Sequence, residues 1–139
     1  MATLTYVKFQ SFIEAVFEKK HNFSSDVLKV YLTNATPSAS ANTVKADIAE
    51  IATGNGYAGS IAVTTTASSQ TGGTYSLAVT LNSTITATGA VGPYRYIVLF
   101  NDTATNKELI GYWDIGSATT LASGDTHTLT ASSPLITAS

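Results

Sequence analysis

The stretch GPYRYIVLFNDT at residues 92–103, followed by LIGYWDIG at residues 109–116, decides the fold class of this chain. Both segments are rich in aromatic and β-branched side chains, which favour β-strands. The residues between them (101–107, NDTATNK) have the polar composition of a turn. The sequence therefore predicts a core β-hairpin, which holds the only Trp and the only Arg of the chain.

Strand signals also occur on either side of this hairpin. TYSLAVTL at residues 74–81 alternates apolar and polar side chains, so its four apolar residues share one face. VLKVYL at residues 27–32 is apolar at both parities, which is typical of a strand covered on both faces. Further strand candidates, separated by turns rich in Gly, Asn and Ser, are residues 61–66, 84–88, 119–122 and 126–130.

The N-terminal part carries a helical pattern instead. An amphipathic helix is predicted over residues 8–20, where one stripe collects Phe9, Phe12, Ile13, Val16 and Phe17. We expect this stripe to pack across one end of the sheet, with Phe12 and Phe17 largely buried. The alternative is a helix that docks on another subunit.

The expected fold is mainly β: an antiparallel β-sandwich, or a flattened barrel, with one N-terminal helix. Apolar residues at helical spacing over 44–51 add a short second helical turn. A length of 139 residues fits a single domain. Its expected parts are the helix at about 8–20, the sandwich at about 26–130 and a loose C-terminal tail at 131–139.

Composition excludes several classes of function. The chain has no cysteine, which excludes disulfides and thiolate metal sites. Its net charge is −2 and only 12% of its residues are charged, which argues against a nucleic-acid-binding surface. A surface so poor in charge suits a protein that packs into an assembly, or an extracellular adhesive module.

No apolar stretch approaches the roughly 18 residues that span a bilayer, so no membrane association is expected. The first residues, MATLTYVK, lack the basic and apolar regions of a secretory signal. We therefore expect a protein made in a cytoplasm and used there, or carried out inside a larger particle.

Catalytic and metal-binding patterns are missing from the sequence. The two histidines, His21 and His127, are far apart, and Asp102 and Asp125 lie beside turn residues, where Asp bonds to its own backbone. No metal-binding, serine-nucleophile or dinucleotide-binding motif is present. We expect no enzymatic activity, no cofactor and no bound metal.

Three residues of the hairpin are candidates for a subunit interface: Arg95, Tyr112 and Trp113. Arg95 alternates with Tyr94 and Tyr96, so it is expected to face away from both and to pair with Asp114 or stack on an aromatic ring. A contact to a partner or a ligand is the alternative. Tyr112 and Trp113 point to opposite faces, so one is expected in the core and the other at an interface.

Four segments together carry a resemblance to a known family. They are KFQSF at residues 8–12, SDVLKVYLTN at 25–34, ADIAEIA with GNGY at 46–57, and the hairpin at 94–116. In these segments the chain resembles small virion proteins of tailed bacteriophages, of the capsid decoration or auxiliary type. The resemblance covers most of the chain, roughly residues 8–130.

The resemblance implies a non-enzymatic structural protein on the surface of the capsid. Its partners would be the major capsid protein and copies of itself, and its effect would be to stabilise the shell. No functional residue is carried over, because the family has no catalytic motif. Two other roles remain open: a tail or neck component of the particle, and a receptor- or carbohydrate-binding β-sandwich module.

Overall fold

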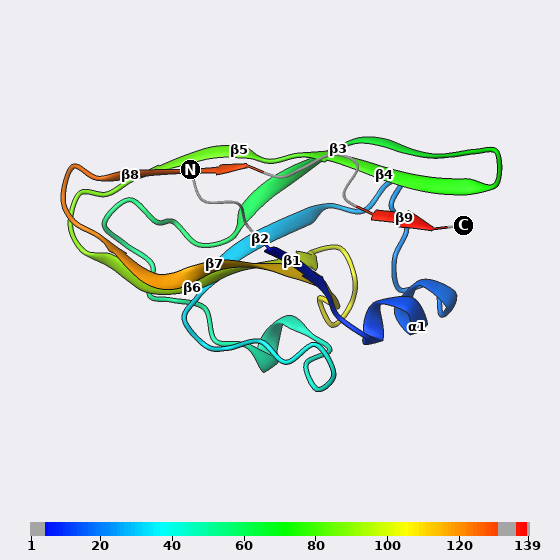
Figure 1. Ribbon diagram of the computed structural model, residues 1–139, viewed down its shortest axis with the longest axis horizontal. Coiled ribbons are helices and arrows are strands. Elements are labelled where there is room, and N and C mark those ends of the chain that lie inside the picture. Colours follow the sequence, from blue (N-terminus) through cyan, green and yellow to red (C-terminus); the bar gives the residue numbers. More distant parts are fainter. Residues whose placement is uncertain (1–4, 131–135, 139) are drawn as a thin grey trace.

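Antiparallel sheets curled into a half-barrel make up the protein, shown in Figure 1 as a computed structural model that describes residues 5–130 and 136–138. The strands are β1 (Thr5–Lys8), β2 (Leu28–Thr33), β3 (Ile61–Thr71), β4 (Thr74–Thr80), β5 (Asn82–Thr86), β6 (Val91–Asn101), β7 (Leu109–Leu121), β8 (Thr126–Thr130) and β9 (Ile136–Ala138). The helical elements are α1 (Ser11–Phe17) and the 3-10 turn η1 (Lys45–Asp47). The predicted fold class, mainly β with one helix and a short helical turn, is confirmed.

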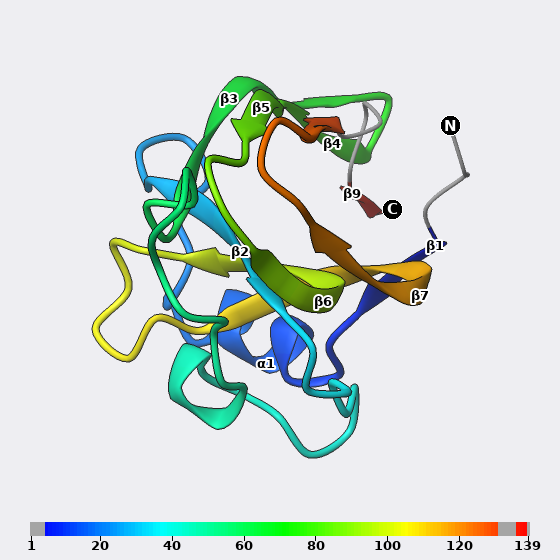
Figure 2. The same cartoon turned by 90° about the vertical axis from the view of Figure 1, so that its left-hand side faces the viewer.

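One sheet has the strand order β1–β7–β6–β2–β3–β4–β9, and β5 pairs with β8 in a separate ribbon. In Figure 1, β3, β4, β5 and β8 form the upper layer, β1, β6 and β7 form the lower layer, and β2 lies between. Figure 2 shows the curl that joins the layers. The half-barrel is open between its two edge strands, β1 and β9.

The predicted hairpin is present as β6 and β7, and both strands are longer than expected. Their pairing runs from Phe100 opposite Leu109 to Val91 opposite Leu121. The segment at 119–122, expected as a separate strand, contains the end of β7. After the turn, β8 pairs with β5 rather than with β7, and this pairing builds the far end of the upper layer.

The main hydrophobic core fills the space between the layers. β2 contributes Leu28, Val30 and Leu32, and β4 contributes Leu77 and Val79. These side chains are fully or almost fully buried. The alternation predicted for residues 74–81 is therefore confirmed, with the apolar face directed inward.

A second, smaller core lies on the other side of the lower layer. Tyr31, Val98 and Phe100 meet there, and Phe9 and Ile48 cover them from the segments outside the sheet. The Tyr31 hydroxyl donates to the backbone carbonyl of Ile48 at 3.1 Å. Because Tyr31 belongs to this core and its neighbours in β2 belong to the main one, β2 is buried on both faces, as its sequence predicts.

The N-terminal helix is shorter than predicted, and a strand precedes it. Residues 5–8 pair with β7 as β1, with Tyr6 opposite Trp113 and the two ring centroids 5.2 Å apart. A Cβ at Gly111 would collide with the Tyr6 ring, so the glycine lets this ring lie close to the sheet. The pairing is non-local, and the helical spacing of residues 9–17 gives no sign of it.

The apolar stripe of α1 is split between core and surface. Phe12 is 4% exposed and its ring stacks with that of Phe23, whereas Phe17 is 85% exposed. The expectation of burial is therefore right for Phe12 and wrong for Phe17. The apolar stripe of α1 is wider than the surface of sheet and loop against which the helix packs. The outer edge of the stripe, which includes Ile13 and Val16, therefore remains exposed.

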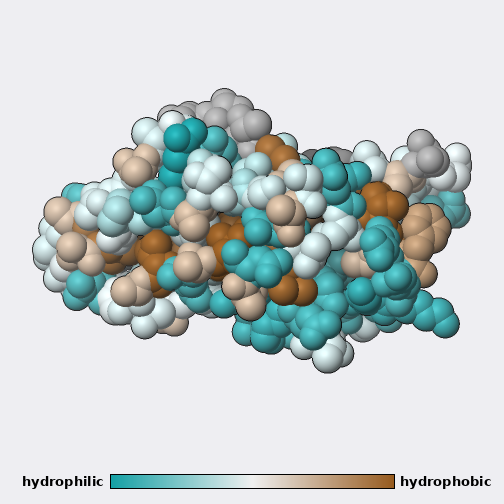
Figure 3. Space-filling model, turned by 90° about the horizontal axis from the view of Figure 1, so that it is seen from below, coloured by the Kyte–Doolittle hydropathy of each residue, from teal (hydrophilic) through white to brown (hydrophobic). Residues whose placement is uncertain are grey.

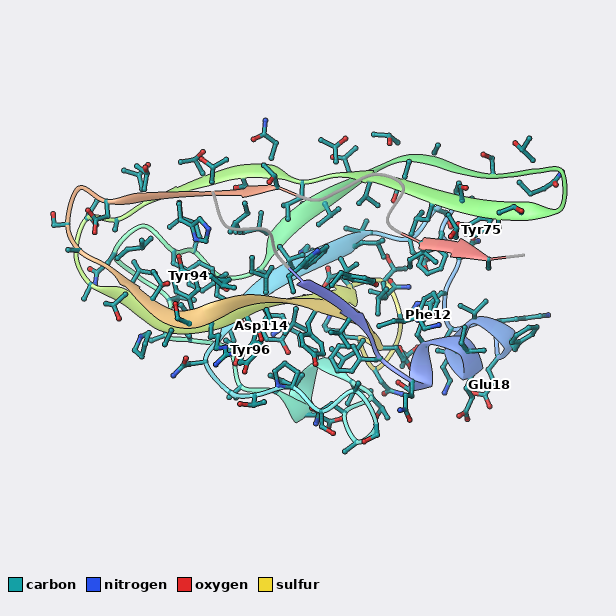
Figure 4. The ribbon with its side chains drawn as sticks, viewed as in Figure 1. Phe12, Glu18, Tyr75, Tyr94, Tyr96 and Asp114 are labelled. Atoms are coloured by element: carbon teal, nitrogen blue, oxygen red, sulfur yellow. The ribbon has the colours of Figure 1, made fainter. Side chains whose placement is uncertain are left out.

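The hairpin contains an irregularity that reverses one side chain. Tyr94 pairs with Thr119 and Tyr96 with Asp114, so β7 has extra residues between the two pairs, with Gly116 there at a φ of 103°. This bulge turns Tyr94 into the main core, while Tyr96 points to the opposite face and contacts Tyr112 (Figure 4). The expectation that both tyrosines share one face is wrong for this reason.

The C-terminal tail, expected to be loose, lies partly outside the described residues, namely at 131–135 and 139. Residues 136–138 differ from the expectation, because they pair with β4 as β9. Ile136 is 8% exposed and packs in the main core, so burial of one apolar side chain accompanies this pairing.

The two phenylalanines of α1 give a direct test of this packing. Phe12→Ala is expected to lower the free energy of unfolding by about 3 kcal/mol, from lost burial and the cavity left behind. Phe17→Ala should change it by less than about 0.5 kcal/mol, since the side chain is exposed. Urea denaturation at low protein concentration measures both values, and equal losses for the two variants would contradict the observed orientation of α1.

Candidate interaction surfaces

The upper layer of the half-barrel presents a face without charged side chains. No Asp, Glu, Lys or Arg occurs between Glu50 and Arg95, which includes all of β3, β4 and β5. β8 and β9 have none either, and Asp125 in the turn before β8 is the only charged residue after Asp114. We call the outward surface of β3, β4, β5 and β8 the charge-free face.

Strand pairing organises the hydroxyl and amide groups of this face into cross-strand pairs. The pairs are Thr64 with Thr80, Asn82 with Thr130, Thr84 with Thr128, and Thr86 with Thr126. The hydroxyls of Thr84 and Thr128 are 2.9 Å apart and hydrogen-bonded. The intervening residues, such as Ile85 and Leu129, are buried, so the period-2 alternation leaves mostly small polar groups outside.

A second surface is the exposed apolar edge of α1, formed by Ile13, Val16 and Phe17, which we call the helix patch. These residues and Val27 are the large hydrophobic side chains exposed among the described residues. Figure 3 shows a group of hydrophobic side chains at its right-hand end, over α1. Three neighbouring apolar side chains at i, i+3 and i+4 form a contiguous patch, which is the arrangement that marks interaction sites.

A groove of about 690 Å³ runs beside the helix patch. The helix side contributes Phe12, Phe17 and Lys19, and the sheet side contributes Tyr75 of β4 and Ile136 of β9. The sheet wall has no charged residue, because β3, β4 and β9 contain none. The groove therefore suits an apolar side chain.

Arg95 forms the ion pair that its position in the hairpin predicts. Its Nε and one terminal nitrogen donate to the two carboxylate oxygens of Asp114, at 2.8 and 3.0 Å, and its guanidinium lies 5.3 Å from the centre of the Tyr96 ring. Hydrogen bonds from Arg95 hold the pKa of Asp114 below its usual value. Both partners are already engaged, which gives Arg95 a structural role; its role at an interface stays a prediction.

The other two interface candidates lie on opposite faces of β7, as predicted. Trp113 is 5% exposed and belongs to the main core, so it offers little area to a partner. Tyr112 is half-buried on the outer face and packs against Phe9 at a ring distance of 5.3 Å. Of the pair, Tyr112 is the one available for an outside contact.

Titratable groups gather near the turn between β6 and β7. Asn101 donates to Asp26 at 2.6 Å and lies 3.0 Å from Nδ1 of His21. His21 and Glu108 are buried, and within the described residues His21 Nε2 and Glu108 Oε2 have no hydrogen-bond partner. No group of three or more His, Asp or Glu in residues 5–130 and 136–138 is arranged to hold a metal ion.

The other histidine lies beneath the upper layer. The Tyr94 hydroxyl and Nδ1 of His127 are 2.5 Å apart, and the two rings stack. Burial lowers the pKa of His127, because water that would solvate its charged form is excluded. This pair links β6 of the lower layer to β8 of the upper layer.

Comparisons with known proteins add no relative to this description: no family model matches the chain, and neither curated proteins nor solved structures gave a match. No helix among the described residues has the length and apolarity to span a membrane.

Sequence reasoning placed its interface candidates on the hairpin, gave a docking helix only as the alternative for residues 8–20, and missed the charge-free face. The long run without charge between Glu50 and Arg95 is visible in the sequence and could have indicated the charge-free face. The helix patch has no such signal, because buried and exposed members of the stripe are equally apolar.

Acidification is expected to destabilise the protein through its histidines. Burial lowers the pKa of both His21 and His127 from the ordinary value of 6.5. The unfolded chain therefore binds protons first, and the free energy of unfolding should fall as the pH drops through 6.5 towards the lower folded values. Each histidine contributes a slope of at most about 1.4 kcal/mol per pH unit.

Urea denaturation between pH 8 and 5 measures this slope, and His127→Gln should reduce it. The range lies above the titration of Asp47, Asp102 and Asp114, whose pKa values are lowered below 3.8. An unfolding free energy that is flat over this range in the wild type would contradict the burial of both imidazoles.

Proposed function

We propose that this chain is a non-enzymatic structural protein of a bacteriophage virion, bound to the outer face of the assembled capsid. Its partners are the major capsid protein and further copies of itself. The resemblance to phage decoration proteins supports this proposal, and the segments that carry it form β2, β6, most of β7 and the cover of the second core. The resemblance therefore concerns the residues that build the fold.

The observation that carries the proposal is the charge-free face. Charged groups are costly to remove from water, and the cores of protein interfaces are depleted in them. A broad face of Thr, Ser and Asn can be buried without that cost, and its hydroxyls can bond to a partner. A surface that stays in water gains no stability from the absence of charged residues on four strands. A surface that is buried against a partner does gain from it, because no charge has to be desolvated.

Decoration needs many modest contacts rather than one strong contact. One interface of about 1,600 Å² is enough for specific binding, and repetition over a shell increases the total effect through multivalency. A protein that binds the assembled lattice and not the free subunits also stabilises the lattice by mass action. The half-barrel has an elongated upper layer along which such a contact can extend (Figure 1).

The main competing role is a glycan- or receptor-binding module, which uses exposed aromatic rings as platforms. Phe17 is the exposed aromatic residue among those described; every tyrosine and Trp113 is buried or half-buried. This distribution favours the decoration proposal. A tail or neck position is distinguished by copy number in the experiment below.

Purified protein mixed with shells that lack it should cosediment in hundreds of copies and raise the temperature of shell disruption. Binding should change little between about 0.05 and 0.5 M salt, a range that shortens the screening length about threefold. Thr64→Lys and Thr86→Lys, on the charge-free face, should weaken binding by about tenfold or more. Thr105→Lys, exposed in the turn between β6 and β7, is the matched control and should bind normally.

Three results would count against the proposal. Binding in a few copies, or to tails alone, favours the tail or neck role. Binding that collapses at 0.5 M salt rejects a contact made through an uncharged face. Equal binding by all three lysine variants assigns the contact to another part of the molecule.

A further inference from the structure

We propose that Asn55 is a site of spontaneous modification, namely deamidation through a cyclic succinimide, and that the folded protein restrains this reaction by holding the side-chain amide. The reaction converts a neutral amide into a carboxylate within the longest stretch of the chain that has no charged residue. The inference requires no partner and does not depend on attachment to a capsid.

The first step of the argument is the residue that follows Asn55. Deamidation begins when the backbone nitrogen of the next residue attacks the side-chain carbonyl carbon of an asparagine. A glycine in that position has no side chain to obstruct the approach, and its backbone turns most freely. Asn55 is the only asparagine of the chain that precedes a glycine, Gly56. The sequence therefore makes it the most reactive asparagine of the chain.

The chemistry needs only the chain itself and water. The Gly56 nitrogen forms a bond to Cγ of Asn55 and loses its proton, while the bond from Cγ to Nδ2 breaks and ammonia leaves. Water then attacks one of the two carbonyl carbons of the five-membered ring, which opens to aspartate or to isoaspartate. No atom is oxidised or reduced in either step.

The second step is the geometry of the turn, which leaves the nucleophile free and holds the group that it attacks. Gly56 is exposed, and its N–H donates to no residue that the structure describes. Nδ2 of Asn55 donates to the carbonyl of Ala90 at 2.9 Å, and Gly89 lies so close that a Cβ there would be 2.8 Å from Cγ of Asn55. The carboxamide has no freedom to rotate while the turn is closed. The reaction therefore proceeds in the fraction of molecules whose turn has opened.

The third step is what the modified chain loses. The turn holds the connection that leads from β5 in the upper layer to β6 in the lower layer (Figure 1): the Thr88 N–H donates to the Asn55 carbonyl at 2.9 Å. A carboxylate at residue 55 would face the Ala90 carbonyl, and two acceptors cannot form a hydrogen bond. Isoaspartate also adds a carbon to the backbone beside Gly56, where even a Cβ would lie 2.0 Å from the Thr86 carbonyl oxygen. The modified turn therefore holds this connection less firmly.

Mass spectrometry with peptide mapping, after incubation of the full chain in mildly alkaline buffer, tests the site. Deamidated product should accumulate at Asn55, at least about tenfold faster in denaturing guanidinium chloride than in native buffer. Asn106, which is exposed and followed by Lys107, is the internal control and should stay unmodified over the same period. Asn55→Gln keeps an amide but would have to close a larger ring, so it should abolish the mass gain whether or not the variant folds.

A variant that carries the product tests the structural role of the amide. Asn55→Asp should lower the folding equilibrium constant roughly 5- to 10-fold at neutral pH, because the hydrogen bond to Ala90 is lost. The matched control is Asn106→Asp, which makes the same change of charge at an exposed residue and should change that constant by less than about twofold. Urea denaturation measures both values.

Each measurement can overturn one part of the inference. Absence of product at Asn55 in denaturant, or equally fast reaction at Asn106, overturns the assignment of the site. Equal rates in native buffer and in denaturant overturn the restraint by the fold. An Asn55→Asp variant as stable as Asn106→Asp overturns the role of the amide in holding the connection between β5 and β6. None of these outcomes bears on shell binding, so the inference and the proposed function fail separately.

Discussion

Burial of the two central strands on both faces is the constraint on which the rest of the structure depends. β2 and β6 send alternate side chains into the main core and into the second core, so both faces need cover. The curl of the sheet brings β3 and β4 over one face, and the segment that contains η1, together with Phe9, covers the other. The chain has no cysteine, so no disulfide adds to the packing of these two cores.

The same curl creates the unfinished parts of the molecule. A half-barrel has free edges, here β1 and β9, and its ends must be covered by other segments. α1 covers one end only in part: Phe12 enters the core and the outer edge of the helix remains exposed. The sheet itself closes the other end, because the β6–β7 pair turns back there and continues as the β5–β8 ribbon. One end of the half-barrel is therefore covered by a helix and the other by the sheet itself, and the exposed apolar patch lies at the end that the helix covers.

Charge is distributed unevenly between the layers, and this gives the two faces different physical properties. Ion pairs such as Arg95 with Asp114 and Lys29 with Asp102 lie on β2, β6, β7 and the turn between β6 and β7. The upper layer exposes hydroxyls and amides, whose contacts respond little to salt. A protein with one such face is suited to a fixed position in an assembly, where only one side meets solvent.

Local patterns in the sequence determined most of the strands, though not β1 or β9, together with the hairpin at 92–116, the two-sided burial of residues 27–32 and the Arg95–Asp114 pair, because alternation and turn composition act over a few neighbouring residues. Only the tertiary structure decided which edge of the α1 stripe is buried, since Phe12 and Phe17 differ in neighbours and not in hydropathy. It also decided the reversal of Tyr94 at the bulge and the pairing of β5 with β8. The candidate surfaces depend on these non-local contacts. Segments without charge that are far apart in the chain form one face only because their strands pair in a particular register. That register depends on the partner strand, which the local sequence pattern does not identify.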